Sequence, residues 1–82
     1  MKAENVELYI WPTCPFCNRA KRLLNELEIP FIDHDIWGKD DEKAALIERT
    51  GQTTVPYVFF GDHFIGGCDD LVAMAKAGDI EK

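Results

Sequence analysis

The sequence predicts an α/β fold with the element order β-α-β-α-β-β-α, in which three helices flank a four-stranded mixed sheet. Four short segments carry the alternating or continuous apolar residues of strands, and three longer segments carry apolar residues at helical spacing. The first two strands enclose a helix, which favours a parallel, right-handed connection. The last two strands are joined by Gly61-Asp62, which favours an antiparallel hairpin.

The first strand and the first helix follow one another closely. Residues 6–10 alternate between aliphatic side chains and Glu or Tyr, as in a half-buried strand. Residues 11–13 end this strand. A helix is expected over residues 14–27, with Pro15 in its first turn, where a missing N–H does no harm. The expected apolar stripe of this helix consists of Phe16, Ala20, Leu23, Leu24 and Leu27.

The middle of the chain predicts a second strand and a second helix. Pro30 ends the first helical pattern, and a strand is expected over residues 31–36. A helix over residues 42–49 is expected to be capped by Asp40 or Asp41 and to end at Gly51. Its inward-facing residues are expected to be Ala45 and Leu46, with Ala44 beside them.

The last third of the chain predicts a hairpin followed by a helix. The two strands are expected over residues 57–60 and 63–65, and Gly66-Gly67 then form a flexible turn. The last helix is expected to begin at Asp69 or Asp70 and to run to Ala77, where Gly78 closes it.

Length, charge and cysteine count restrict the function. The 82 residues are expected to form one domain, residues 1–82, and the hydrophobic content of 46% supports a small core. The formal net charge of −6 argues against nucleic acid as a partner. Three cysteines do not make the even set of a secreted disulfide framework. The N-terminal residues are polar and charged, unlike a signal peptide, and no apolar run is long enough to span a bilayer. We therefore expect a cytoplasmic protein in a reducing setting.

The pair Cys14 and Cys17 is the most informative chemical feature. A C-x-x-C at the junction of a strand and a helix places the first cysteine where unpaired N–H groups favour the thiolate, and the second one turn further in, within reach of a disulfide. The pair could also supply half of a zinc site, but Cys68 with His34 or His63 would have to complete it, and no second paired motif exists. Thiol–disulfide exchange is therefore the first hypothesis.

Three basic residues follow the dithiol in the predicted first helix: Arg19, Lys21 and Arg22. One interpretation is a solvated helix face. The other is a positive field that steers anionic thiols toward Cys14. Both interpretations remain open.

The segment Thr54-Val55-Pro56 precedes the third strand. A proline there cannot donate a hydrogen bond to a sheet, so one interpretation is an ordinary trans start of an edge strand. The other is a cis-proline turn beside the dithiol, which leaves the backbone of Val55 to pair with an extended peptide. We predict the cis form for Pro56.

The segment Gly66-Gly67-Cys68-Asp69-Asp70 precedes the last helix. The two glycines allow a ligand to approach the backbone, and the N–H groups of a helix start can bind a carboxylate. One aspartate could hold an ammonium group as well as cap the helix, so the segment matches the zwitterion of an α-amino acid. Cys68 is expected to be a small, partly buried residue, with a second redox role as the alternative.

Three segments together resemble the glutaredoxin family in their order and spacing over nearly the whole chain: Cys14-Pro15-Phe16-Cys17, Thr54-Val55-Pro56 and residues 66–70. Within that family, the chain is similar to the small bacterial dithiol type. The resemblance implies a thioredoxin-like fold, glutathione as co-substrate, and reduction of protein disulfides and of glutathione mixed disulfides. The implied partners are glutathione and disulfide-bonded or glutathionylated proteins. No metal, nucleic acid or membrane is expected, and the protein is expected to be a monomer.

The resemblance also implies roles for individual residues. Cys14 is the nucleophile and Cys17 the resolving thiol. The implied glutathione contacts are Lys43 for the glycine carboxylate, the backbone of Val55 between Thr54 and Pro56 for the cysteinyl part, and Gly67, Cys68 and Asp69 for the γ-glutamyl end.

Trp11 departs from the family pattern, because similar proteins usually carry a lysine three residues before the first active cysteine. Without that cation, we expect weaker binding of a glutathione carboxylate and a less favoured thiolate at Cys14. Arg19, Arg22 or Lys43 could supply the charge instead.

Two other functions remain alternatives. One is a [2Fe–2S] cluster ligated by Cys14 and external glutathione between two protomers; Pro15 counts against it. The other is a thioredoxin-like electron donor reduced by a flavin enzyme; the motif at residues 66–70 counts against it. A visible absorption spectrum and a coupled assay with each reducing system would discriminate between them.

Overall fold

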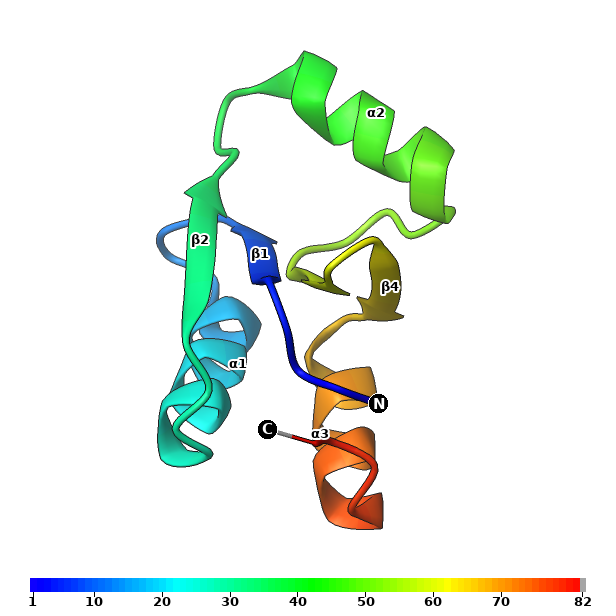
Figure 1. The fold of residues 1–82 in the computed structure, drawn as a ribbon. Coiled ribbons are helices and arrows are strands. Elements are labelled where there is room, and N and C mark those ends of the chain that lie inside the picture. The colour runs from blue at the N-terminus through cyan, green and yellow to red at the C-terminus, as the bar shows by residue number, and fades with distance from the viewer. Residues whose placement is uncertain (82) are drawn as a thin grey trace.

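The structure is a computed structural model that describes residues 1–81, and the element order is the one that the sequence predicts (Figure 1). The elements are β1 (Val6–Ile10), α1 (Pro15–Glu26), β2 (Phe31–Asp35), α2 (Asp40–Thr50), β3 (Tyr57–Phe60), β4 (His63–Gly66) and α3 (Cys68–Ala77).

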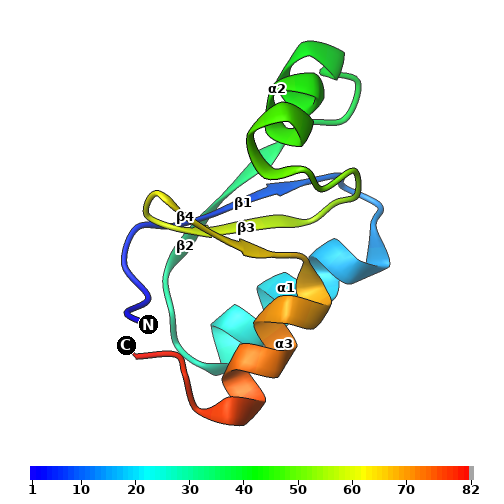
Figure 2. The ribbon, with the colours of Figure 1, turned by 90° about the vertical axis from the view of Figure 1, so that its right-hand side faces the viewer.

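The four strands form one mixed sheet in the order β2-β1-β3-β4. β1 is parallel to β2 and antiparallel to β3, and β3 is antiparallel to β4, which confirms the predicted connection of the first β-α-β unit and the hairpin. Figure 2 shows the sheet nearly edge-on, with α1 and α3 on one face and α2 alone on the other. No helix within residues 1–81 is both long and apolar enough to cross a membrane.

Alternation along the central strands divides the buried side chains between the two faces. The face covered by α1 and α3 has the larger core: Val6, Leu8, Ile10, Cys17, Ala20, Leu24, Ile29, Val58, Phe60, Cys68 and Leu71. The face covered by α2 has a smaller and more aromatic core: Ile36, Leu46, Tyr57 and Phe59.

The three helices end as predicted but begin differently in two cases. Gly51 closes α2 and Gly78 closes α3, both with left-handed backbone. α2 begins two residues earlier than predicted, after Lys39, and no side chain caps it. Its three acidic first-turn residues instead complement the positive end of the helix dipole. α3 begins at Cys68, because Gly67 takes the extended conformation of the N-cap.

Three expected core residues are exposed. Phe16, in the first turn of α1, is 55% exposed. Ala44 and Ala45 of α2 are also exposed, and Leu46 is the buried residue of that helix. The prediction for α2 was wrong at these alanines because the helix has little apolar content to define an inner face.

Candidate active site

The first part of the site is the start of α1. Cys14 is the N-cap residue, and its sulfur accepts a hydrogen bond from the Cys17 N–H at 3.4 Å. Pro15 occupies the first turn, as predicted. Both thiols are free; Cys14 is partly exposed, whereas Cys17 is fully buried. The α1 start therefore presents one sulfur to the outside and keeps the other beneath it.

The two thiols differ in reactivity because they differ in burial. Desolvation raises the pKa of the Cys17 thiol to about 12, with a further increase from Cys14, while a backbone hydrogen bond from Trp11 opposes the shift. Cys17 is therefore a neutral thiol at physiological pH. Because only a thiolate attacks a disulfide efficiently, the partly exposed Cys14 is the residue suited to attack first.

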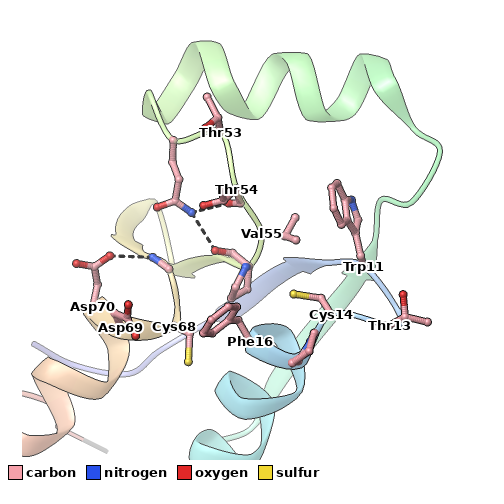
Figure 3. Close-up of a pocket in the computed structure, with 14 residues that line it drawn as sticks. Trp11, Thr13, Cys14, Phe16, Thr53, Thr54, Val55, Cys68, Asp69 and Asp70 are labelled. Carbon is pink, nitrogen blue, oxygen red and sulfur yellow. Dashed lines mark hydrogen bonds between the residues drawn. The ribbon is translucent and has the colours of Figure 1, made fainter.

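The second part of the site is the turn before β3. The Val55–Pro56 bond is cis, which confirms the prediction for Pro56. The side-chain amide of Gln52 donates to the carbonyls of Thr54 and Pro56 at 2.7 and 3.0 Å (Figure 3). Within residues 1–81, neither the N–H nor the C=O of Val55 has a hydrogen-bond partner. The turn is thus braced by Gln52 and leaves the Val55 backbone open.

The third part of the site is the start of α3. The Asp70 carboxylate accepts a hydrogen bond from the Gly67 N–H at 2.9 Å, so Asp70 rather than Asp69 closes this turn. A side chain at Gly66 would meet the carboxyl carbon of Asp70 at 2.6 Å, which explains the glycine there. Among the residues described, the N–H groups of Cys68 and Asp69 have no acceptor. They can receive an anion.

The third cysteine lies beside these groups. Cys68 is 3% exposed, as a small buried residue is expected to be. Burial raises the pKa of the Cys68 thiol; Arg19 opposes the shift, whereas Asp69 and Cys14 add to it. Cys68 is therefore a neutral neighbour of the dithiol.

The three parts enclose one pocket of about 600 Å³. Figure 3 shows Cys14 at its centre with Val55 above it, Trp11 at one end, and Asp69 and Asp70 at the other. The lining residues are Trp11, Thr13, Cys14, Pro15, Phe16, Gln52, Thr53, Thr54, Val55, Pro56, Gly67, Cys68, Asp69 and Asp70.

Most of the residues expected from the sequence lie together in this pocket. The exceptions are Cys17, which lies beneath Cys14, and Lys43, whose ammonium lies 4.7 Å from the ring centroid of Trp11 without lining the pocket itself. Sequence reasoning missed Gln52 as the brace of the cis-proline turn. Its only signal was a polar side chain between a helix-ending glycine and the Thr-Thr-Val-Pro segment.

Among the residues described, no lysine, arginine or histidine lines the pocket. Lys21 pairs with Asp33 at 3.4 Å and also opposes the rise in the Cys17 pKa, so both interpretations of the basic residues after the dithiol remain open. His34 lies 2.8 Å from a Glu7 carboxylate oxygen, and His63 is exposed. Within residues 1–81, no three His, Cys, Asp or Glu side chains come together as a metal-ion cluster.

A cysteine pair at a helix start, a facing cis-proline turn and this four-stranded mixed sheet define a thiol oxidoreductase of thioredoxin-like fold. A family model described as glutaredoxin matches residues 6–65. The chain belongs to the glutaredoxin family.

Individual relatives agree with this assignment over most of the chain. Glutaredoxin 3 of Escherichia coli (strain K12) is 43% identical over 77 residues, covering 94% of this chain and 93% of that protein. The solution structure of glutaredoxin from Brucella melitensis has a TM-score of 0.82 at 38% identity, covering 94% of this chain and 84% of that one. The buckwheat glutaredoxin–glutathione complex has a TM-score of 0.86 at 33% identity, covering 89% of this chain and 69% of that one.

Proposed function

We propose that the protein is a glutathione-dependent dithiol oxidoreductase that reduces protein disulfides and glutathione mixed disulfides. The observation that carries the proposal is the pocket itself, which joins the exposed sulfur of Cys14 to the open backbone of Val55 and the open N–H groups of Cys68 and Asp69. The similarity to a glutaredoxin that was solved with glutathione supports this choice of co-substrate.

The reaction begins with attack of the Cys14 thiolate on one sulfur of the substrate disulfide. A mixed disulfide with Cys14 forms, and the other substrate sulfur leaves as a thiolate. If the bound group is a protein, Cys17 loses its proton and attacks the Cys14 sulfur, which releases the protein thiol and forms the Cys14–Cys17 disulfide. Two glutathione molecules then reduce this disulfide and become one glutathione disulfide. Because the pKa of Cys17 is high, deprotonation of its thiol is the least favourable step of this route.

If the bound group is a glutathionyl group, Cys17 is not needed. A second glutathione thiolate attacks the glutathionyl sulfur, glutathione disulfide leaves, and the Cys14 thiolate is regenerated. One protein thiol therefore suffices for glutathione mixed disulfides, whereas the intramolecular route to protein disulfides uses both.

The proposed glutathione orientation runs along the pocket. The cysteinyl backbone pairs with Val55 between Thr54 and Pro56, as in strand addition. The γ-glutamyl carboxylate meets the N–H groups of Cys68 and Asp69, and its ammonium group meets the Asp69 carboxylate. Gly67 has no side chain and so lets glutathione approach the backbone closely. It does not donate a hydrogen bond to glutathione, because its N–H already donates to Asp70. Lys43 is the proposed partner of the glycine carboxylate.

The test is reduction of a small glutathione mixed disulfide, with glutathione disulfide production coupled to glutathione reductase. Cys14→Ser should abolish turnover, and Cys17→Ser should retain most of it. With a protein disulfide as substrate, both variants should lose most of the activity. Substantial turnover by Cys14→Ser, or no glutathione-dependent turnover by the wild type, would reject the proposal.

We also propose that the protein acts in the cytoplasm as a monomer without a bound metal. A colourless freshly purified protein that elutes at monomer size would support this, because a shared [2Fe–2S] cluster requires two protomers and absorbs visible light. Reduction by a flavin-dependent thioredoxin reductase, and not by glutathione, would favour the alternative electron donor.

A further inference from the structure

We propose that Trp11 is a positioning residue that holds the Lys43 ammonium at the end of the pocket, so that helix α2 supplies the positive charge for the substrate's terminal carboxylate. This inference rests on the proposed function. It gives a role to the tryptophan that stands where the sequence led us to expect a cation.

The first observation is that Trp11 belongs both to the pocket and to the contact with Lys43. It follows β1 and lines the pocket with Cys14, and Figure 3 shows its indole between the pocket and α2. The Lys43 ammonium lies 4.7 Å from the centroid of its ring. That distance is within the range of a cation–π interaction, for which tryptophan is the best aromatic partner.

The second observation is that Trp37 packs against the indole of Trp11. The two rings meet edge to face, with centroids 5.2 Å apart and planes at 85°. Trp37 lies between β2 and α2, and its backbone N–H donates to the Asp35 carboxylate at 2.9 Å, which shapes the turn that carries it. The Trp11 side chain also packs against the small core under α2, so its ring presents a defined face on which a flexible lysine can rest.

The third observation is the charge distribution along the pocket. Among residues 1–81, those that line it include Asp69 and Asp70 but no lysine, arginine or histidine. Figure 3 places these acidic residues at the end away from Trp11. A peptide with an ammonium group at one end and a carboxylate at the other thus has a complementary partner at the far end only if Lys43 is held there.

The fourth observation is that Lys43 is not engaged in an ion pair. Among the side chains described, no carboxylate lies within 4.0 Å of its ammonium group, whereas Lys39, one turn earlier, pairs with Glu42 at 3.7 Å. An aromatic face attracts the ammonium without neutralising it. No described acidic side chain therefore competes with a ligand for the Lys43 ammonium, and Lys39, the N-cap residue of the same helix, provides a control.

The experiment compares two substrates that differ in one charge. One is the mixed disulfide of glutathione and 2-mercaptoethanol, and the other is the same compound with the glycine carboxylate as an ethyl ester. The wild type should have a lower KM for the acid. Trp11→Leu and Lys43→Gln should each raise the KM for the acid roughly two- to fivefold, as expected for an exposed cation–π interaction, with kcat nearly unchanged. Because Trp11 lines the pocket for both substrates, the readout is the ratio of the KM for the ester to the KM for the acid, which should fall roughly two- to fivefold in each variant.

Further variants make the test specific. The double variant Trp11→Leu/Lys43→Gln should have the same KM as either single variant, because both changes remove one interaction. Lys43→Arg and Trp11→Phe should retain most of the preference for the acid, and Lys39→Gln should retain all of it. In a Trp37→Phe background, where Trp11 is the only tryptophan left, Lys43→Gln should shift the fluorescence emission; the sequence contains two tryptophans in all.

The outcomes separate the two proposals. If the wild type turns over both compounds and Trp11→Leu keeps the full preference for the acid, Trp11 does not position Lys43. The same conclusion follows if the two single variants have additive effects on KM. If the wild type turns over neither compound, the proposed function itself fails, and the substrate-binding role of Lys43 fails with it.

Discussion

The two faces of the sheet are built from the same strands but with different chemistry. Under α1 and α3, aliphatic side chains form a continuous core around Leu8 and Leu24, and this core carries all three cysteines. Under α2, most of the packing is aromatic, and basic side chains lie on the rings: Lys43 over Trp11 and Arg49 over Phe59, each at 4.7 Å from the centroid. One face therefore holds the three thiols in an aliphatic core, whereas the other places cations on aromatic rings.

The difference extends to how each face is covered. α1 and α3 lie side by side against the sheet in both Figure 1 and Figure 2, whereas α2 lies alone on the opposite face. Beyond the small core under α2, Tyr9 stacks on His34 at 4.7 Å, and His34 in turn lies 2.8 Å from Glu7. This face therefore combines partly exposed rings with polar groups. We expect it to contribute less to stability per residue than the aliphatic core.

The largest expected effect tests this difference with two matched leucines. Leu24 of α1 is fully buried and Leu46 of α2 is 6% exposed. Leu24→Ala should lower the free energy of unfolding by about 3–5 kcal/mol, and Leu46→Ala by about 2 kcal/mol, because a site near the surface can relax around the lost methyl groups. Urea denaturation of both variants measures the two values. An equal or larger loss at Leu46 would mean that the α2 face is a core of the same quality.

The inner face of α1 was predictable from the sequence, whereas that of α2 was not. The spacing of Ala20 and Leu24 identified the inner face of α1, because aliphatic residues there recur every three or four positions next to polar ones. α2 offered Leu46 and two alanines, and the alanines proved exposed. Cations that rest on aromatic rings leave no periodic signal, because the partners come from distant segments.

The candidate site shows the same limit. Its residues at 14–17, 54–56 and 66–70 are short motifs whose chemistry can be read locally, and the structure brings them together in one pocket. Gln52 and Trp11 could not be placed in this way. Gln52 acts through the carbonyls of Thr54 and Pro56, whose directions are set by the folded turn, and Trp11 contacts Lys43, which comes from α2.

An intermediate effect is expected from alkaline pH, through the thiol chemistry of the α1 and α3 face. Burial raises the pKa of Cys17 to about 12, well above the value of about 8.5 for a free thiol. Below pH 8.5 the thiol is protonated in both the folded and the unfolded states, and its contribution to stability is complete. As the pH rises toward 12, the unfolded chain loses this proton while the folded chain keeps it, so stability falls. The loss from Cys17 should reach about 2 kcal/mol by pH 10.

Urea titrations from pH 7 to pH 10 with a non-thiol reductant measure this loss. Cys17→Ala should flatten the decline, although Cys68, whose pKa is also raised by burial, should leave part of it. Tyr9→Phe is the control on the opposite face. The pKa of Tyr9 is raised above its usual value of about 10, so this residue contributes only at higher pH. An unchanged decline in Cys17→Ala would show that its thiol is not shielded from water in solution.

The smallest expected effect tests whether cations on rings stabilise the α2 face. Arg49 lies over Phe59 and also occupies the last turn of α2, where a positive charge complements the helix dipole. Arg49→Gln should therefore cost about 1 kcal/mol, whereas Arg49→Lys, which keeps the charge, should cost about half as much. Arg22→Gln on the exposed side of α1 is the control, with an expected change below about 0.5 kcal/mol. If Arg49→Gln and Arg22→Gln have the same unfolding free energy, the ring contact contributes nothing, and the α2 face is stabilised by its four buried side chains alone.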